Sequence, residues 1–196
     1  MIENPTLNTI RRRRSAYRFA SEPISDEQLE AILEAGRWAP SARNSQPWDF
    51  VVVTDPQIRS RMGAVLRDVT WAWSGFVAAP VMIVVAVDPL RDPNHHVEDG
   101  AIAAQNLCLA AHSVGLASSW AGVYGNGIRK QTAEKALKRL LSLPPTHRVI
   151  AVIPIGTASH VGRGSRHPLA EMVHRDRFHP LERSELEAST AAALSE

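Results

Sequence analysis

The chain has 196 residues and a net charge of +2, with 44% hydrophobic and 21% charged residues. This composition is typical of a soluble globular protein, and so small a net charge argues against a nucleic-acid partner. The single cysteine, Cys108, excludes an internal disulfide and fits a reducing compartment. A chain of this length is expected to form one domain. Because the N-terminus shows no signal peptide, we expect that domain to be cytoplasmic.

Amphipathic helices and apolar strands follow one another along the chain. A short helix is expected over residues 6–14, and a capping box of Ser25 and Gln28 opens a second helix that ends before Pro40. Hydrophobic spacing then predicts strands over 49–54, 81–87 and 149–155 and helices over 56–70, 97–116 and 129–142. Residues 180–196 are expected to form a weak helix or a frayed tail.

Residues 100–128 contain no Asp, Glu, Lys or Arg, so a membrane segment has to be considered. Gln105, Asn106 and His112 interrupt this stretch, which is rich in Ala rather than Leu or Ile. We therefore expect a buried helix, with Cys108 in the core, and no membrane association. The small residues of this helix would also allow another subunit to approach closely.

The stretch from Ala39 to Trp48 differs from ordinary loop sequence. Pro40 and Pro47 fix φ and lack an N–H, so they stiffen the six residues between them. Those residues offer hydroxyl, amide and guanidinium groups, and an apolar strand follows. A rigid polar loop in this position suits a polar, planar ligand, and a well-capped loop without a ligand is the alternative.

Four consecutive arginines, residues 11–14, precede Ser15 and two aromatic residues. Guanidinium groups bind phosphate oxygens in pairs, and a nearby hydroxyl adds another donor. One interpretation is therefore an anion site, and the other is a solvated basic surface. Arg163 and Arg166, in a Gly-containing basic loop, are candidates to complete the anion site or are solvated loop charges.

Other motifs are ambiguous or absent. The aromatic segment 71–76 is either a packed connector or a lid over a flat substrate. His95 and His96 have no matched carboxylate or cysteine pair nearby, so no metal site is expected. The sequence lacks a Gly-rich dinucleotide fingerprint, a P-loop and a nucleophile elbow, and we assign no catalytic acid, base or nucleophile.

Four segments together resemble the nitroreductase family of FMN-dependent oxidoreductases. They are Arg13-Arg14-Ser15 with Tyr17-Arg18-Phe19; Ala39-Pro40-Ser41-Ala42 with Asn44 and Gln46-Pro47-Trp48; Gln105-Asn106-Leu107 with Gly115-Leu116 and Trp120-Ala121-Gly122; and Ile153-Pro154-Ile155-Gly156 with Arg166-His167-Pro168-Leu169. The first two segments are the more specific. The resemblance implies a single nitroreductase-like domain over 1–196, with a core of about 7–178 and a C-terminal tail over 179–196.

The resemblance implies an α+β fold in which helices flank a central mixed β-sheet, built as an intertwined homodimer with FMN at the interface. Three residues would bind the phosphate and ribityl oxygens, namely Arg13, Arg14 and Ser15. Four loop residues would reach the flavin from the other subunit: Pro40, Ser41, Ala42 and Asn44. Gln46, in the same loop, is also expected to bind the cofactor. The ring near its N5 edge would be lined by Trp120, Ala121 and Gly122. Arg166 would close on the phosphate, and Arg163 is a further candidate.

The activity that the resemblance implies is reduction of nitroaromatic, quinone or related planar acceptors by NAD(P)H. NADH or NADPH would pass a hydride to flavin N5 and leave, and the acceptor would take its place in a ping-pong cycle. The alternatives are a reductive dehalogenase, a dehydrogenase or a flavin-cleaving enzyme of the same family, a non-catalytic flavin-binding module, or a nucleic-acid-binding module. The sequence departs from the family's motif at one position. Tyr17 is expected to bind the cofactor because of its place in the motif, but many relatives have Arg there. Charge near the flavin would then have to come from Arg18 or Arg43.

Overall fold

The computed structural model describes residues 2–162 and 164–178 of the chain. The chain divides into two compact units, Met1–Gly162 and Arg163–Glu196. The first unit contains the β-sheets and the six α-helices of the described residues. The expectation of a single domain over 1–196 stays a prediction, and the tail 179–196 lies outside the described residues.

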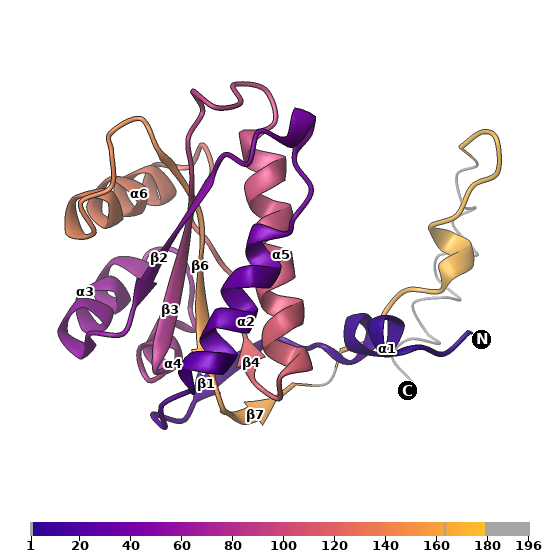
Figure 1. Ribbon diagram of the computed structural model, residues 1–196, viewed down its shortest axis with the longest axis horizontal. Coiled ribbons are helices and arrows are strands. Elements are labelled where there is room, and N and C mark those ends of the chain that lie inside the picture. The colour runs from indigo at the N-terminus through magenta and orange to yellow at the C-terminus, as the bar shows by residue number, and fades with distance from the viewer. Residues whose placement is uncertain (1, 163, 179–196) are drawn as a thin grey trace. The chain divides into compact units, whose positions relative to one another are not determined.

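The first unit is built around a five-stranded sheet (Figure 1). Its strands in spatial order are β2 Trp48–Val53, β3 Val81–Val87, β6 Arg148–Gly156 and β4 Ala117–Ser118, and β5 Ala121–Gly122 also pairs with β6. The three longer strands confirm the strands expected from the apolar runs. β3 is buried along its whole length because it lies between β2 and β6 and both of its faces are covered.

All the ladders of this sheet are antiparallel. β3 and β4 run in the same direction and are joined by helix α5 His96–Ser113, but β6 lies between them and pairs antiparallel with both. Within the described residues, parallel pairing is limited to one bridge between Ser15 and Ser118. The α+β fold class is therefore confirmed. The sheet was expected to contain both parallel and antiparallel pairing, and the Ser15–Ser118 bridge is the parallel pairing found among the described residues.

Helices cover both faces of the sheet (Figure 1). α2 Asp26–Arg37 and α5 share one apolar core with Ile83 and Val85 of β3. α3 Pro56–Leu66, α4 Trp73–Val77 and α6 Ile128–Leu140 cover the other face, whose core contains Met82 and Val84. Alternate residues of β3 thus point into two cores, and each fully buried aliphatic side chain contributes about 1.5–3 kcal/mol.

Local capping accounts for the helix ends. The Ser25 hydroxyl accepts the Gln28 N–H and the Gln28 side chain accepts the Ser25 N–H, both at 3.1 Å, which confirms the predicted capping box. α5 ends at Ser113, earlier than the expected residue 116, because Gly115 adopts a φ of +81° that turns the chain out of the helix.

A second, two-stranded sheet pairs β1 Ala16–Phe19 with β7 Ala158–Val161, and Arg18 lies opposite His160 in this ladder. Helix α1 Pro5–Arg12 precedes β1 and lies close to the helix expected over 6–14. Neither β1 nor β7 is predicted from the sequence, because four residues are too few for a clear alternating pattern.

The described residues of the second unit, 164–178, contain one short 3₁₀ helix, η2 Leu169–Glu171. In it, His167 Nδ1 lies 3.6 Å from a carboxylate oxygen of Glu171. In the described parts of the chain, no helix is both long enough and apolar enough to cross a membrane.

Candidate functional site

A basic cavity of about 320 Å³ lies where the end of α1, the C-terminal end of α5, β4 and β7 meet. It is lined by Arg12, Arg13, Arg14, His112, Gly115, Leu116, Ala117, Ser118, Thr157, Ala158 and Val161. Within the described part of the chain, this lining carries four basic side chains and no carboxylate. Such a donor set attracts an anion, and guanidinium groups can offer paired N–H donors to phosphate oxygens. Arg14 Nη1 already donates to the backbone carbonyls of Arg11 and Arg13, so its remaining N–H groups would be the ones offered.

The Ser118 hydroxyl forms part of this cavity. Its side chain is only 2% exposed and has no nitrogen or oxygen partner within the described residues. It lies against the thiol of Cys108, whose pKa is raised by burial in the core, as expected for a core cysteine. Ser118 also bridges to Ser15, which places that residue at the edge of the same cavity. A buried hydroxyl beside three arginines is a ready donor for a polar ligand.

A larger, aromatic cavity of about 1050 Å³ lies along β1. It is lined by Tyr17, Arg18, Phe19, Trp71, Ala72, Ser74, Gly75, His160 and Gly162. The rings of Tyr17 and Trp71 are 4.9 Å apart at an angle of 40°, and both remain exposed, at 42% and 78%. An open aromatic wall of this kind suits a flat ring system.

The two cavities are linked by the β1–β7 ladder. Val161 lines the basic cavity and pairs with Ala16, while His160 lines the aromatic cavity and pairs with Arg18. One ligand with an anionic end and a flat end could therefore contact both cavities. Arg18 lines the aromatic cavity together with Tyr17 and brings positive charge to it, and whether it replaces the arginine expected at position 17 stays a prediction.

The segment from Trp120 to Gly122 continues from Ser118 along the edge of β6. Ala121 is buried and pairs with Val152, and Gly122 follows it. A Cβ atom on Gly122 would lie 3.2 Å from Nε1 of Trp120, so the indole of Trp120 covers the glycine backbone. The indole is 38% exposed.

The loop predicted to bind a ligand is strained and pre-organised. Ala42–Asn44 form a 3₁₀ turn, η1, and Arg43, Asn44 and Gln46 adopt φ values of 52°, 58° and 46°. Non-glycine residues rarely adopt positive φ, and three in one loop cost several kcal/mol unless their surroundings impose them. The Gln46 N–H donates to the Ser41 hydroxyl at 3.0 Å, which closes the loop across the turn.

Two buried carboxylates hold this loop in place. Asp99, in the first turn of α5 and 3% exposed, accepts the Ala42 N–H at 3.1 Å and the Ser45 hydroxyl at 3.3 Å. Asp92 is fully buried and lies 3.7 Å from the Arg43 guanidinium. Hydrogen bonds from the backbone N–H groups of Asn94 and His95, just before α5, lower the pKa of Asp92, so it stays charged at neutral pH.

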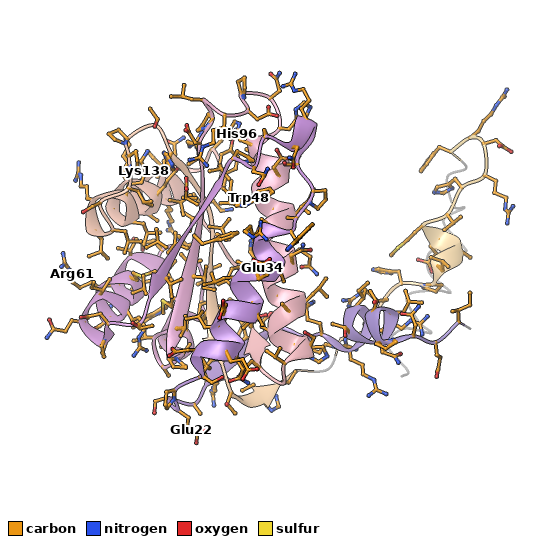
Figure 2. All side chains as sticks on the ribbon, in the orientation of Figure 1. Glu22, Glu34, Trp48, Arg61, His96 and Lys138 are labelled. Atoms are coloured by element: carbon orange, nitrogen blue, oxygen red, sulfur yellow. The ribbon has the colours of Figure 1, made fainter. Side chains whose placement is uncertain are left out.

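Within one chain, the loop and the basic cavity lie at opposite ends of α5 (Figure 1). Asp99 and His112 mark the two ends, and at 1.5 Å per residue they are about 20 Å apart. His96, which is labelled in Figure 2, lies at the loop end of the helix. Arg43 is at this end too, so it cannot supply charge beside Tyr17 of its own chain.

The structure therefore divides the predicted site residues into two groups. One group surrounds the linked cavities and the neighbouring sheet edge: Arg13, Arg14, Ser15, Tyr17, Trp120, Ala121 and Gly122. The other belongs to the loop at the far end of α5: Pro40, Ser41, Ala42, Asn44 and Gln46. Arg163 lies outside the described residues, and Arg166 belongs to the second unit, where it donates to the Ser165 carbonyl at 2.7 Å. The roles of these two arginines stay predictions.

The family model described as the Nitroreductase family matches residues 10–73 and 63–157. These ranges include both groups of predicted site residues and stop before the second unit. The chain belongs to the Nitroreductase family. A relative from Methanothermobacter thermautotrophicus, named as a candidate NADH dehydrogenase or NAD(P)H nitroreductase, is 34% identical over 158 residues, which cover 76% of this chain and 75% of the relative.

Two further nitroreductase-family comparisons carry cofactor names. The NADPH-flavin oxidoreductase of Vibrio harveyi is 28% identical over 200 residues, covering 94% of this chain and 79% of that protein. A crystal structure from Desulfovibrio desulfuricans, described as a candidate nitroreductase in complex with FMN, has a TM-score of 0.76 and 34% identity. It covers 91% of this chain and 100% of that chain.

Three residues of this nitroreductase-family chain acquire a candidate role only from the structure, and a fourth, Trp71, had an ambiguous signal in the sequence. His112 and Ser118 line the basic cavity, Trp71 stacks near Tyr17, and Asp99 holds the loop. Trp71 carried a signal, since the aromatic segment 71–76 could be predicted as a connector or a lid. His95 and His96 do not belong to a group of side chains that could hold a metal ion, and no such group occurs elsewhere among the described residues.

Proposed function

We propose that this protein is an FMN-dependent oxidoreductase that uses NAD(P)H to reduce nitroaromatic, quinone or related planar acceptors. The observation that carries the proposal is the pair of linked cavities, one basic and one aromatic, in a chain of the Nitroreductase family. FMN, when bound, would supply the hydride-transfer chemistry between NAD(P)H and the acceptor.

The residues of the two cavities fit such a cofactor. Arg13 and Arg14 would hold the phosphate, with Ser15 on the ribityl chain, because the cavity is basic and lacks carboxylates. Tyr17 would lie beside the ring system in the aromatic cavity. Trp120 and Gly122 would line its reactive edge, with the indole of Trp120 packed over the glycine.

The chain's own contribution is binding and electrostatics rather than proton transfer. No side chain of the two cavities is assigned as a catalytic acid or base. Positive charge from Arg18 would stabilise negative charge on the reduced cofactor. The exposed rings of Tyr17 and Trp71 would favour flat acceptors by stacking.

The proposed site is completed by a second copy of the chain. The loop with Ser41 and Asn44 is rigid and polar but lies about 20 Å from the basic cavity of the same chain. A homodimer would bring the loop of one chain to the cavities of the other. The outer face of α5 supports this arrangement, because Ile102 is 40% exposed on a helix rich in small residues.

The test is the visible absorption spectrum of the purified protein, before and after NAD(P)H is added without oxygen. Flavin bands that bleach on addition are expected. Bands that persist would contradict NAD(P)H as the reductant and favour the non-catalytic flavin-binding module or another flavin chemistry. A colourless protein that does not retain FMN after incubation and dialysis would overturn the cofactor assignment.

A matched pair of variants tests the phosphate contacts. Arg13→Ala with Arg14→Ala should lower FMN affinity by at least tenfold, because each charged hydrogen bond contributes about 1.5–3 kcal/mol. Arg129→Ala with Arg139→Ala removes the same charge from helix α6, away from both cavities, and should leave FMN affinity unchanged. Normal FMN content in the first double variant would contradict the phosphate assignment.

A further inference from the structure

His112 is a basic residue of the cavity that the reaction does not use. It lies in the last turn of α5 and faces the cavity together with Arg12, Arg13 and Arg14, which come from the end of α1 and the segment after it. Among the described residues, no carboxylate lines the cavity to neutralise this cluster. Four basic groups from two elements therefore converge on one small volume.

The surroundings of His112 keep its imidazole neutral while no anion is present. Burial lowers its pKa below the ordinary value of 6.5, and the charges of Arg13, Arg14 and Arg12 lower it further. On its own helix, Cys108 lies one turn earlier and is a neutral thiol, because burial raises its pKa. The β4 and β7 walls contribute Ser118 and Thr157, which do not titrate near neutral pH.

A bound phosphate dianion reverses this balance. Without the anion, the arginines repel a positive charge on His112. With the dianion bound among them, its two negative charges attract that positive charge instead. An opposite charge within about 4–6 Å raises a histidine pKa by about 1–3 units. The carbonyl groups at the C-terminal end of α5 also favour a cation at this position. The neutral imidazole would then gain a proton and become a donor.

We propose that His112 is a fourth basic ligand of the phosphate group in this cavity and that it takes up a proton when the dianion binds. This inference rests on the proposed function, because it takes the phosphate of FMN as the anion. It assigns to the site a residue outside the arginine–serine cluster, and it makes cofactor affinity depend on pH.

The sign of the pH dependence follows from linkage. Binding raises the pKa of His112, so affinity is highest below the pKa of the free site and falls as pH rises through the pKa of the complex. Each unit of pKa shift corresponds to about tenfold in affinity. The phosphate itself becomes a monoanion below about pH 6, so the informative range is about pH 6.5–8.5.

The experiment measures FMN affinity across this range by quenching of flavin fluorescence, with the full-length protein freed of flavin. The unaltered protein should bind FMN several-fold more weakly at about pH 8.5 than at about pH 6.5. His112→Gln should remove this dependence and weaken binding at the lower end, whereas His112→Lys should bind tightly throughout. Ser113→Ala is the control for the helix end, because its hydroxyl bonds only the Ala110 carbonyl at 2.8 Å. Riboflavin, which lacks the phosphate, should bind with no such dependence.

The outcomes separate the two claims. If His112→Gln binds FMN with the same affinity and pH dependence as the unaltered protein, the inference about His112 is wrong and the proposed function stands. If riboflavin shows the same pH dependence as FMN, the proton is not coupled to the phosphate and the inference is also wrong. If the unaltered protein does not bind FMN at any pH, the proposed function and the inference fail together.

Discussion

At the scale of single residues, backbone strain marks the loop that the proposed function places against the cofactor. Arg43, Asn44 and Gln46 all have positive φ, a conformation that costs energy for any residue with a Cβ atom. Asp99 offsets this cost, since its buried carboxylate accepts both a backbone N–H and a hydroxyl of the loop. The loop shape is therefore held before any ligand arrives.

Asp99→Ala should release the loop. The change leaves the Ala42 N–H and the Ser45 hydroxyl without their acceptor, which costs about 1–3 kcal/mol of unfolding free energy. Urea denaturation measures this loss, and FMN affinity should fall in parallel if the loop contacts the cofactor. Asp68→Ala, at an exposed position, is the control and should change stability by less than about 0.5 kcal/mol. Unchanged stability and flavin content in Asp99→Ala would show that the carboxylate does not position the loop.

At the scale of secondary-structure elements, the aromatic cavity depends on how closely α4 approaches β1. Gly75 makes this approach possible, because a Cβ atom there would collide with the carbonyl oxygen of Tyr17. The same contact sets the position of Tyr17 relative to Trp71, just before α4. Since the obstructing atom belongs to the backbone, rotation of a side chain cannot relieve the collision.

Gly75→Ala should therefore separate α4 from β1. Overpacking of this kind costs about 1–3 kcal/mol of unfolding free energy. Because the aromatic wall would shift as well, the KM for a planar acceptor should rise. Ser74→Ala, at the exposed neighbouring position, adds no volume and should change stability by less than about 0.5 kcal/mol. Equal denaturation midpoints for the two variants would contradict the close-approach argument.

At the scale of the whole molecule, α5 separates the two groups of predicted site residues. The arginine group lies at its C-terminal end and the loop at its N-terminal end, about 20 Å apart. If both groups bind one cofactor, they must come from different chains. The proposed site would then not exist in a monomer, and cofactor binding would depend on association.

Mixing two defective chains tests this dependence. Chains with Arg13→Ala and Arg14→Ala, and chains with Ser41→Ala and Asn44→Gly, should each lose flavin as pure proteins. Glycine is used at Asn44 because it tolerates the φ of 58°. A heterodimer isolated through two different tags has one intact site, so its flavin content should be about half that of the unaltered dimer. A heterodimer with no more flavin than its parents would indicate that each site lies within one chain.

Much of the fold and part of the site could be predicted from local patterns. The capping box at Ser25 and the buried strand β3 were predicted correctly, because both depend on neighbouring side chains or on a continuous apolar run. The strands β1 and β7 had no such signal, because their pairing joins residues about 140 positions apart and each has only four residues. Long-range pairing is not visible in a local window.

The sequence by itself determined the main helices and strands, the rigid polar loop and the candidate anion-binding arginines, because these follow from hydrophobic spacing and residue chemistry. The fold class followed from the resemblance of its motifs to a known family. Only the tertiary structure decided that Arg13 and Arg14 share a cavity with His112 and Ser118. The tertiary structure also decided that the loop lies far from them in the same chain. The physical reason is the length of α5, a rigid rod whose two ends carry different parts of the candidate site.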